Sequence, residues 1–565
     1  MPKIECQDER LWNYIGRKFT LDGLKEILPA AKAELDGLGE EGELKLEFND
    51  TNRPDLWSAA GLGRQLKTYL SGKLPEYDFF SRADIPRPCG SRLVKVDPKL
   101  EHIRPYIVAF EITGKKVDDA LLKEIIQSQE KLCWNYGRKR SSIAMGIYRS
   151  DMIEYPVLYR AADPDKDGFV PLGFEKRMSL REILKEHPKG QEFGHIIAHM
   201  PLYPYLTDSR GDVLSMPPVI NSAHIGAVKE GDDTLFVELT GSDMPSLTLA
   251  ASIVACDLAD AGFTIKPVKT EYPYDTPLGR EVTIPFYFQK PVSVSLAYAE
   301  KLLGMAFTEK EALTCLGKAG CAAKAEGGSL TVTPPVYRND FLHPVDIVEE
   351  LMIGRGMQAF EPVMPRDFTV GRLSRAEVFI RQVKSIMVGL GFQEMIYNYL
   401  GSGRDFIEKM GLKGADIVRI GNPMSESFEY VRNSILPCLL SSESVSGNGV
   451  SPHRIFEVGK IALLDPSENY GTATKNYLGF LTADKLAGFN EVNANVSAFF
   501  YYINREYTLS EIEDPRFIGG RCAAVMADGR RVGLFGELRP EVLDSWGISM
   551  PCSAGEVDLD FLREE

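Results

Sequence analysis

The sequence predicts an α+β protein with several domains. Its 565 residues suffice for three or four domains, and 44% hydrophobic with 26% charged residues is ordinary for a globular protein. Proline-containing segments around Pro86 and Pro88 and at 272–277 mark linkers. With a further boundary after residue 365, these linkers give four predicted domains, 1–85, 86–272, 273–365 and 366–565.

The first two domains are predicted to mix helices with strands. In residues 1–85, a polar loop at 48–57 leads into a helix over 58–70 within a small α/β unit. In residues 86–272, the run from Asp208 to Gly211 is typical of a hairpin turn between two apolar runs. A buried strand is predicted over 235–239, followed by a helix over 247–261.

The third domain, 273–365, is predicted to be a small α+β unit. A strand over 282–288 precedes a helix that ends at Gly304, and Thr308 with Glu311 forms a capping box that opens a second helix. A strand over 329–333 follows, and then an acidic helix over 345–353 with Pro344 in its first turn.

The fourth domain, 366–565, is predicted to be a mostly antiparallel sheet with flanking helices. A capping box at Ser374 and Glu377 opens a helix that ends at Gly391. Strand-like apolar runs then occur at 454–458, 477–481, 523–526 and 532–535.

Composition limits where the protein works and what it binds. The sequence contains no run of about 18 apolar residues, so no membrane span is expected. The N-terminus has no signal region. Nine cysteines without a C-x-x-C pair indicate a reducing cytoplasm. Because the net charge is −15, any RNA binding must be local. The candidate basic groups are Arg138, Lys139 and Arg140, and Lys176, Arg177, Arg181, Lys185 and Lys189.

Four carboxylates near the acidic helix predict a metal site. Asp346, Glu349 and Glu350 are spaced i, i+3 and i+4, which places them on one helix face, and Asp340 lies one loop earlier. Oxygen ligands without His or Cys favour Mg²⁺, with Ca²⁺ as second choice. The alternative is a solvated acidic helix face.

The pattern around these carboxylates resembles a known family. Arg338-x-Asp340, then Asp346, then Glu349-Glu350, then Gly-Arg355-Gly is similar to the metal-carrying module of phenylalanyl-tRNA synthetase beta subunits. The stretch 422–437, with Arg432, resembles the second signature of the class II synthetase fold in that family. Asn433 follows Arg432 where an active class II site has an acidic residue, and no third signature is present. The resemblance therefore implies a class II synthetase-like domain without an ATP site.

Residues 86–272 resemble the editing module of the same family, in its archaeal and eukaryotic form. The matching segments are 169–173, 187–190, 214–221 and 237–243. By position, the resemblance assigns four residues to the tRNA-hydrolysing pocket: Leu206, Ser215, Glu238 and Thr240. Family members often carry Asp where this chain has Glu238.

A physical argument supports this pocket. An apolar synthetic site rejects the added hydroxyl of tyrosine only about 10²-fold, so a second, hydrolytic site is useful. A carboxylate there could accept the phenol proton of tyrosine and leave phenylalanine without a partner. Glu238 and Thr240 alternate with apolar residues, so both face one side of a strand. Ser215 has no His–Asp partners nearby in sequence, which favours positioning of substrate or water over nucleophilic attack.

The resemblance implies the beta subunit of an α₂β₂ enzyme of the short archaeal/eukaryotic type. The alpha subunit would carry the ATP and phenylalanine chemistry. The beta subunit would contribute tRNA(Phe) contacts and hydrolysis of Tyr-tRNA(Phe). Mg²⁺ would act twice, with ATP in alpha and at the four carboxylates. Two alternatives remain open: an RNA-binding scaffold that has lost editing, favoured by Glu238 in place of Asp, and a stand-alone editing hydrolase.

Overall fold

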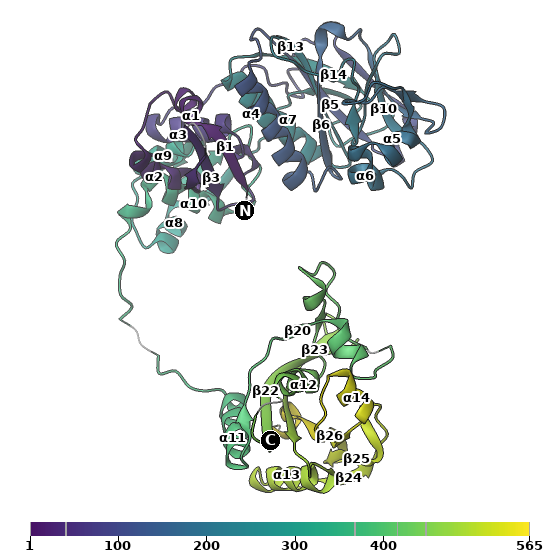
Figure 1. Cartoon of the computed structure of the whole chain (residues 1–565). Coiled ribbons are helices and arrows are strands. Elements are labelled where there is room, and N and C mark those ends of the chain that lie inside the picture. Colours follow the sequence, from purple (N-terminus) through teal and green to yellow (C-terminus); the bar gives the residue numbers. More distant parts are fainter. Residues whose placement is uncertain (1, 40–41, 367–368, 415, 447–448, 564–565) are drawn as a thin grey trace. The chain divides into compact units, whose positions relative to one another are not determined.

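The chain forms two compact units, Met1–Val363 and Met364–Glu565 (Figure 1). The computed structural model describes all residues except 1, 40–41, 367–368, 415, 447–448 and 564–565. Among the described residues no helix is both long and apolar enough to cross a membrane. All nine cysteines are free thiols.

The first unit begins with a three-stranded antiparallel sheet in the order β1-β3-β2. Its apolar residues alternate with exposed ones, so one face packs against helices and the other meets solvent. The elements are β1 (Lys3–Gln7), α1 (Asp8–Ile15), α2 (Leu21–Ile27), β2 (Ala33–Leu38), β3 (Glu43–Phe48) and α3 (Ala59–Ser71).

A ten-stranded sheet follows, in the order β12-β11-β10-β7-β4-β14-β5-β13-β6, with β15 added beside β14. Most neighbours are antiparallel, but β4 runs parallel to both β7 and β14. The strands are β4 (Leu93–Val96), β5 (Tyr106–Thr113), β6 (Ile143–Arg149), β7 (Val157–Ala162), β10 (Tyr203–Thr207), β11 (Val213–Met216), β12 (Ile220–Asn221), β13 (Thr234–Gly241), β14 (Thr264–Glu271) and β15 (Glu281–Ile284).

Helices cover this sheet and make β13 a core strand. Helix α7 packs against β5 and β13, with α4 near it (Figure 1), and β13 is buried from its second residue to its last. Burial on both faces explains the nearly unbroken apolar run of β13. The remaining elements here are α4 (Asp119–Lys131), β8 (Gly168–Phe169), β9 (Met178–Ser179), α5 (Leu180–Glu186), α6 (Pro188–Phe193) and α7 (Met244–Asp260).

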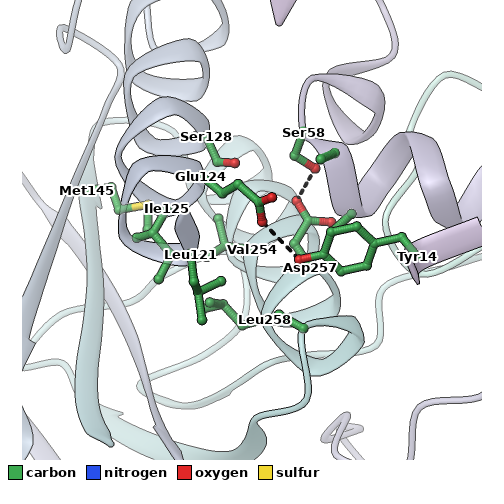
Figure 2. A pocket seen from close by; sticks show the side chains of 13 residues that line it. Tyr14, Ser58, Leu121, Glu124, Ile125, Ser128, Met145, Val254, Asp257 and Leu258 are labelled. Carbon is green, nitrogen blue, oxygen red and sulfur yellow. Dashed lines mark hydrogen bonds between the residues drawn. The ribbon is translucent and has the colours of Figure 1, made fainter. Parts of the chain in front are cut away.

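A small cavity lies where the N-terminal helices meet α4 and α7. Figure 2 shows its polar end, where Tyr14 donates a 3.0 Å hydrogen bond to Glu124 and Ser58 donates one of 2.7 Å to Asp257. The cavity volume is about 30 Å³, enough for about one to three water molecules. This space therefore belongs to the packing of the seam and is too small for an organic ligand.

The last part of the first unit is a three-stranded sheet, β16-β18-β17, packed against three helices. Its apolar core is separate from the core of the ten-stranded sheet. The elements are β16 (Val292–Ser295), α8 (Leu296–Leu303), α9 (Glu309–Lys318), β17 (Ala322–Glu326), β18 (Ser329–Thr333) and α10 (Pro344–Arg355).

The second unit is built on a seven-stranded sheet, β19-β22-β23-β27-β26-β25-β24, whose pairs are antiparallel except β19 with β22. Separate apolar cores involve α11 with α13 and α12 with α14. The elements are α11 (Arg375–Gly389), β19 (Gln393–Glu394), β20 (Leu400–Gly401), β21 (Tyr430–Val431), α12 (Leu436–Val445), β22 (His453–Leu464), β23 (Thr472–Ala483), α13 (Phe489–Tyr502), β24 (Thr508–Glu511), β25 (Phe517–Ala527), β26 (Arg530–Leu538), α14 (Pro540–Ser545), β27 (Cys552–Asp558) and α15 (Leu559–Arg563).

Most predicted elements are confirmed, with two local differences. The strand predicted over 282–288 ends at Ile284, because Pro285 has no N–H to donate to the neighbouring strand. The capping box at Thr308 is complete. At Ser374 only the side-chain bond to the Glu377 N–H forms. The three boundaries between the four predicted domains stay predictions.

Candidate functional site

Side chains from opposite ends of the ten-stranded sheet meet at Tyr148. Its Oη lies 2.8 Å from Oε1 of Glu238 on β13 and 2.8 Å from Oγ of Ser215 on β11. All three side chains are buried. Because β6 and β11 stand near opposite ends of the strand order, the sheet must curve until its two edges approach each other. Tyr148, Ser215 and Glu238 lie where these two edges come together.

The three groups form a hydrogen-bonded chain. A phenol has one proton, and an ionised carboxylate can only accept. Tyr148 therefore donates to Glu238, and its oxygen can accept the Ser215 proton. The Asn221 Oδ1, on β12, lies 3.5 Å from the same phenol oxygen.

Strand register explains why these side chains can meet. Glu238 stands opposite Gly146 on β6, and Ser215 stands opposite Leu206 on β10. A Cβ at position 146 would overlap the Tyr148 hydroxyl and lie 2.7 Å from the Glu238 Oε1. Glycine at this position therefore leaves the space in which the phenol and the carboxylate meet.

Glu238 is a buried carboxylate with one unused oxygen. Its residue is 2% exposed, and its Oε2 has no hydrogen-bond partner among the described residues. Burial raises the pKa of Glu238 to about 7, although the Tyr148 hydrogen bond and the Arg104 charge oppose that rise. A buried acceptor without a donor is unfavourable on its own. A ligand hydroxyl that reached Oε2 would remove this penalty.

Arg104 holds the other end of the site. Its Nε donates to the Thr240 Oγ1 at 3.0 Å, and its Nη2 donates to the Thr240 carbonyl at 2.6 Å. Burial lowers the pKa of Arg104, while its carbonyl and hydroxyl partners satisfy its N–H groups. Since the Thr240 oxygen accepts from Arg104, its own proton stays available for a ligand acceptor.

The structure places all four predicted pocket residues in this region. Ser215 and Glu238 are joined through Tyr148, Leu206 pairs with Ser215, and Thr240 lies two residues beyond Glu238 on β13. Sequence reasoning missed the residues that connect them. A sequence signal existed for two of them, because Gly146 and Tyr148 occupy alternate positions in the otherwise apolar strand β6. The missed residues are Arg104, Gly146, Tyr148 and Asn221.

Of the four carboxylates predicted to bind Mg²⁺, two meet at Arg338 and two have other partners, and the metal site stays a prediction. Asp340 and Glu350 both accept from the Arg338 guanidinium, at 2.6 Å each from its Nη2. Asp346 accepts the N–H groups of Leu342 and His343 and so caps its own helix. Among the described residues, no group of three or more His, Cys, Asp or Glu is placed to hold a metal ion.

Basic side chains from other segments pair with these carboxylates. Glu349 points to Lys32, whose Nζ lies 2.9 Å from its Oε1. Burial would raise the pKa of Asp340, but the charge and hydrogen bonds of Arg338 overcome this and hold it at about 2. The Arg338 guanidinium therefore supplies a counter-charge to two of the four carboxylates, and helix α10 is anchored through Glu350.

The second unit carries Arg432, the residue aligned with the class II signature. Its side chain is fully buried, and its Nη1 and Nη2 donate to both oxygens of Glu457 at 2.6 and 3.0 Å. Its Nε donates to the Lys460 carbonyl at 2.9 Å. This geometry uses the guanidinium within the protein and leaves it no exposed face toward a phosphate.

Comparison with known proteins agrees with these features. Residues 361–559 match the family described as phenylalanyl tRNA synthetase beta chain CLM domain, and residues 292–357 match the tRNA synthetase B5 domain. The chain is 48% identical to the phenylalanine–tRNA ligase beta subunit of Borrelia hermsii over 99% of both chains. It is 46% identical to that of Borrelia recurrentis over 100% of both.

A solved structure supports the same assignment for the first unit. It is an N-terminal fragment of the phenylalanyl-tRNA synthetase beta subunit from Pyrococcus horikoshii. It is similar with a TM-score of 0.59 and 36% identity, over 63% of this chain and 100% of that chain. The resemblance to beta subunits is therefore confirmed at the level of the family: the chain belongs to the phenylalanine–tRNA ligase beta-subunit family.

Proposed function

We propose that the chain works with an alpha subunit, as an α₂β₂ enzyme of the short archaeal/eukaryotic type, to attach phenylalanine to tRNA(Phe) in the cytoplasm. Its similarity to beta subunits along its whole length supports this. ATP and its Mg²⁺ are assigned to the alpha subunit, because the Arg432 guanidinium is bonded to Glu457. The second unit then serves as a partner surface.

The pocket around Glu238 is assigned to hydrolysis of tyrosine esterified to tRNA(Phe). The observation that carries this is the buried carboxylate, with one oxygen held by Tyr148 and the other unpaired. A tyrosine phenol can donate to that free oxygen. A bound phenylalanine ring would bury the Oε2 of Glu238 without donating a hydrogen bond to it. Burying an unpaired charged acceptor costs more free energy than burying a paired one, so tyrosine should bind better than phenylalanine.

The remaining groups orient the ester. Thr240 offers a proton donor two residues along the same strand, and Ser215 lies on β11, across the Tyr148 hydroxyl from Glu238. Water attacks the carbonyl carbon, the bond to the ribose oxygen breaks, and that oxygen takes up a proton. Ser215 is assigned to positioning substrate or water, because its hydroxyl faces a phenol rather than an imidazole base.

Deacylation of pre-formed Tyr-tRNA(Phe) by the assembled enzyme tests this function. Glu238→Ala should slow it by about 10- to 150-fold, the equivalent of one charge-assisted hydrogen bond. Phenylalanine charging should hardly change. Glu111→Gln is the matched control, because this buried glutamate on β5 accepts from Ser150 and Tyr155 instead. Equal rates for parent and Glu238→Ala would remove Glu238 from the site.

The alternative function is a scaffold that keeps the fold without editing. Glu238 is the feature that suggested it, because its arm is one methylene longer than that of aspartate. The bridge to Tyr148 gives that longer arm a partner. A parent deacylation rate no faster than spontaneous hydrolysis would favour the scaffold.

A further inference from the structure

A strained basic turn is bonded to Arg104, which holds Thr240 of the candidate site. Arg138, Lys139 and Arg140 have φ values of 49°, 52° and 67°, in the left-handed region that residues with a Cβ rarely adopt, and three in succession is exceptional. The turn is held by the N–H groups of Lys139 and Arg140, which donate to the carbonyls of Trp134 and Cys133 at 2.9 Å. Trp134 to Arg140 is called the 134–140 turn below.

The 134–140 turn is tied both to the β13 side and to the β11 side of the Glu238–Tyr148–Ser215 cluster. Arg104, which bonds Thr240, also donates to the carbonyls of Ser141 at 3.0 Å and Arg140 at 3.2 Å. The Arg140 guanidinium donates to the carbonyls of Pro218 and Val219 at 3.2 and 3.0 Å. Those two residues form the turn between β11, which carries Ser215, and β12. The strained conformation is thereby fixed relative to the pocket.

The outward side of the turn combines an aromatic ring with cations. Trp134 is 47% exposed, whereas the other three tryptophans are buried. The Lys139 Nζ lies 5.2 Å from the Trp134 ring centre. Arg138 borders a cleft of about 910 Å³, together with Asn135 and Tyr136.

The charge of this surface is unusual for the chain. Asp and Glu outnumber Lys and Arg by 80 to 65, yet Lys139 and Arg138 form no ion pair with a carboxylate in the described part of the chain. Cations left unpaired beside an exposed aromatic ring suit a partner with both phosphates and bases. An acidic peptide would use the charges but not the ring.

We propose that the 134–140 turn binds the unpaired 3′-terminal nucleotides of an RNA, with Trp134 stacking on a base and Arg138 and Lys139 contacting phosphates. This inference rests on the proposed hydrolytic function of the pocket, because it supplies the path by which an esterified 3′ end reaches Glu238. The rigid links through Arg104 and Arg140 fix the distance from the stacked base to the pocket.

Binding of the full chain to two RNA hairpins tests this surface. One hairpin carries four unpaired 3′ nucleotides and the other is blunt, and fluorescence anisotropy gives both affinities. Trp134→Ala should weaken binding of the overhanging hairpin about 5- to 150-fold, the range for loss of one base stack, and leave the blunt hairpin unchanged. Trp134→Phe should retain most of the affinity.

Salt dependence isolates the phosphate contacts. Lys139→Ala and Arg138→Ala should each reduce the slope of log affinity against log salt concentration by about 0.7 for the overhanging hairpin. Lys116→Ala is the matched control. Lys116 lies near the start of β13, because it follows Thr113, which pairs with Thr234. The 134–140 turn lies near the other end of β13, because it precedes Ile143, which pairs with Gly241.

The outcomes separate this inference from the proposed function. Unchanged affinity and slope in the Trp134 and Lys139 variants would overturn it, as would a parent chain that binds both hairpins equally or an acidic peptide in preference to both. Glu238→Ala should leave hairpin binding intact. Loss of deacylation in Glu238→Ala with unchanged RNA binding in Trp134→Ala would leave the proposed function standing alone. The reverse pattern would leave only the RNA surface.

Discussion

Replacing Glu238 by Gln should stabilise the first unit in a pH-dependent way. In the folded protein burial raises the pKa of Glu238 from 4.5 to about 7. The native state therefore holds more protons than the unfolded state between these pH values, so this residue lowers the free energy of unfolding as pH rises through the interval. At 1.36 kcal/mol per pH unit, the loss is about 3 kcal/mol above pH 7.

Glu238→Gln removes this titration and keeps the shape of the side chain. The stability of the variant relative to the parent should rise by about 3 kcal/mol between pH 4.5 and pH 8. Hydrogen exchange of the β13 amides is a suitable assay, because it reports opening of this sheet independently of the second unit. Glu230→Gln, on the exposed loop before β13, should keep the pH dependence of the parent.

A difference between variant and parent that stays constant from pH 4.5 to 8 would refute this reasoning. It would mean that Glu238 is ionised in the folded state at low pH, with a donor on each oxygen. The unpaired Oε2 would then not be available to a ligand.

Three further predictions follow from the remaining contacts. Tyr148→Phe removes the hydrogen bond that lowers the pKa of Glu238, so the pH at which deacylation of Tyr-tRNA(Phe) reaches half its maximal rate should move upward, and an unchanged pH profile would exclude the bridge. Glu350→Ala leaves Arg338 partly uncompensated in a buried pair and should cost about 3 kcal/mol, whereas a metal chelator should leave the melting temperature of the parent unchanged. A chelator-induced drop would support the predicted metal site. The chain without an alpha subunit should not charge tRNA(Phe), as a filter-binding assay with labelled phenylalanine can show.

The sequence predicted the local pattern of the site better than its closure. Alternation along β13 correctly placed Glu238 and Thr240 on one face, because side-chain direction in a strand has a period of two. Tyr148 could not be found this way. Its contact with Ser215 depends on the curvature of ten strands, which accumulates from twist and has no signature within a single strand.

The acidic helix shows the same limit for charges. Its extent over Pro344–Arg355 contains the predicted span, and the helical spacing of its carboxylates is as expected. Which cation pairs with each carboxylate depends on side chains outside this helix. Arg338 and Lys32 neutralise Glu350 and Glu349, and Lys32 comes from a segment more than 300 residues earlier in the chain. Spacing alone cannot tell whether a cluster of carboxylates faces a metal ion or a distant basic side chain.

The central claim is that Glu238 recognises the phenol of a misattached tyrosine. The most direct measurement compares kcat/KM for hydrolysis of Tyr-tRNA(Phe) and Phe-tRNA(Phe), in the parent enzyme and in Glu238→Ala. If the carboxylate accepts the phenol proton, the preference of the parent for the tyrosyl ester should fall by about 10- to 150-fold in the variant. A preference that is equal in parent and variant would contradict the account.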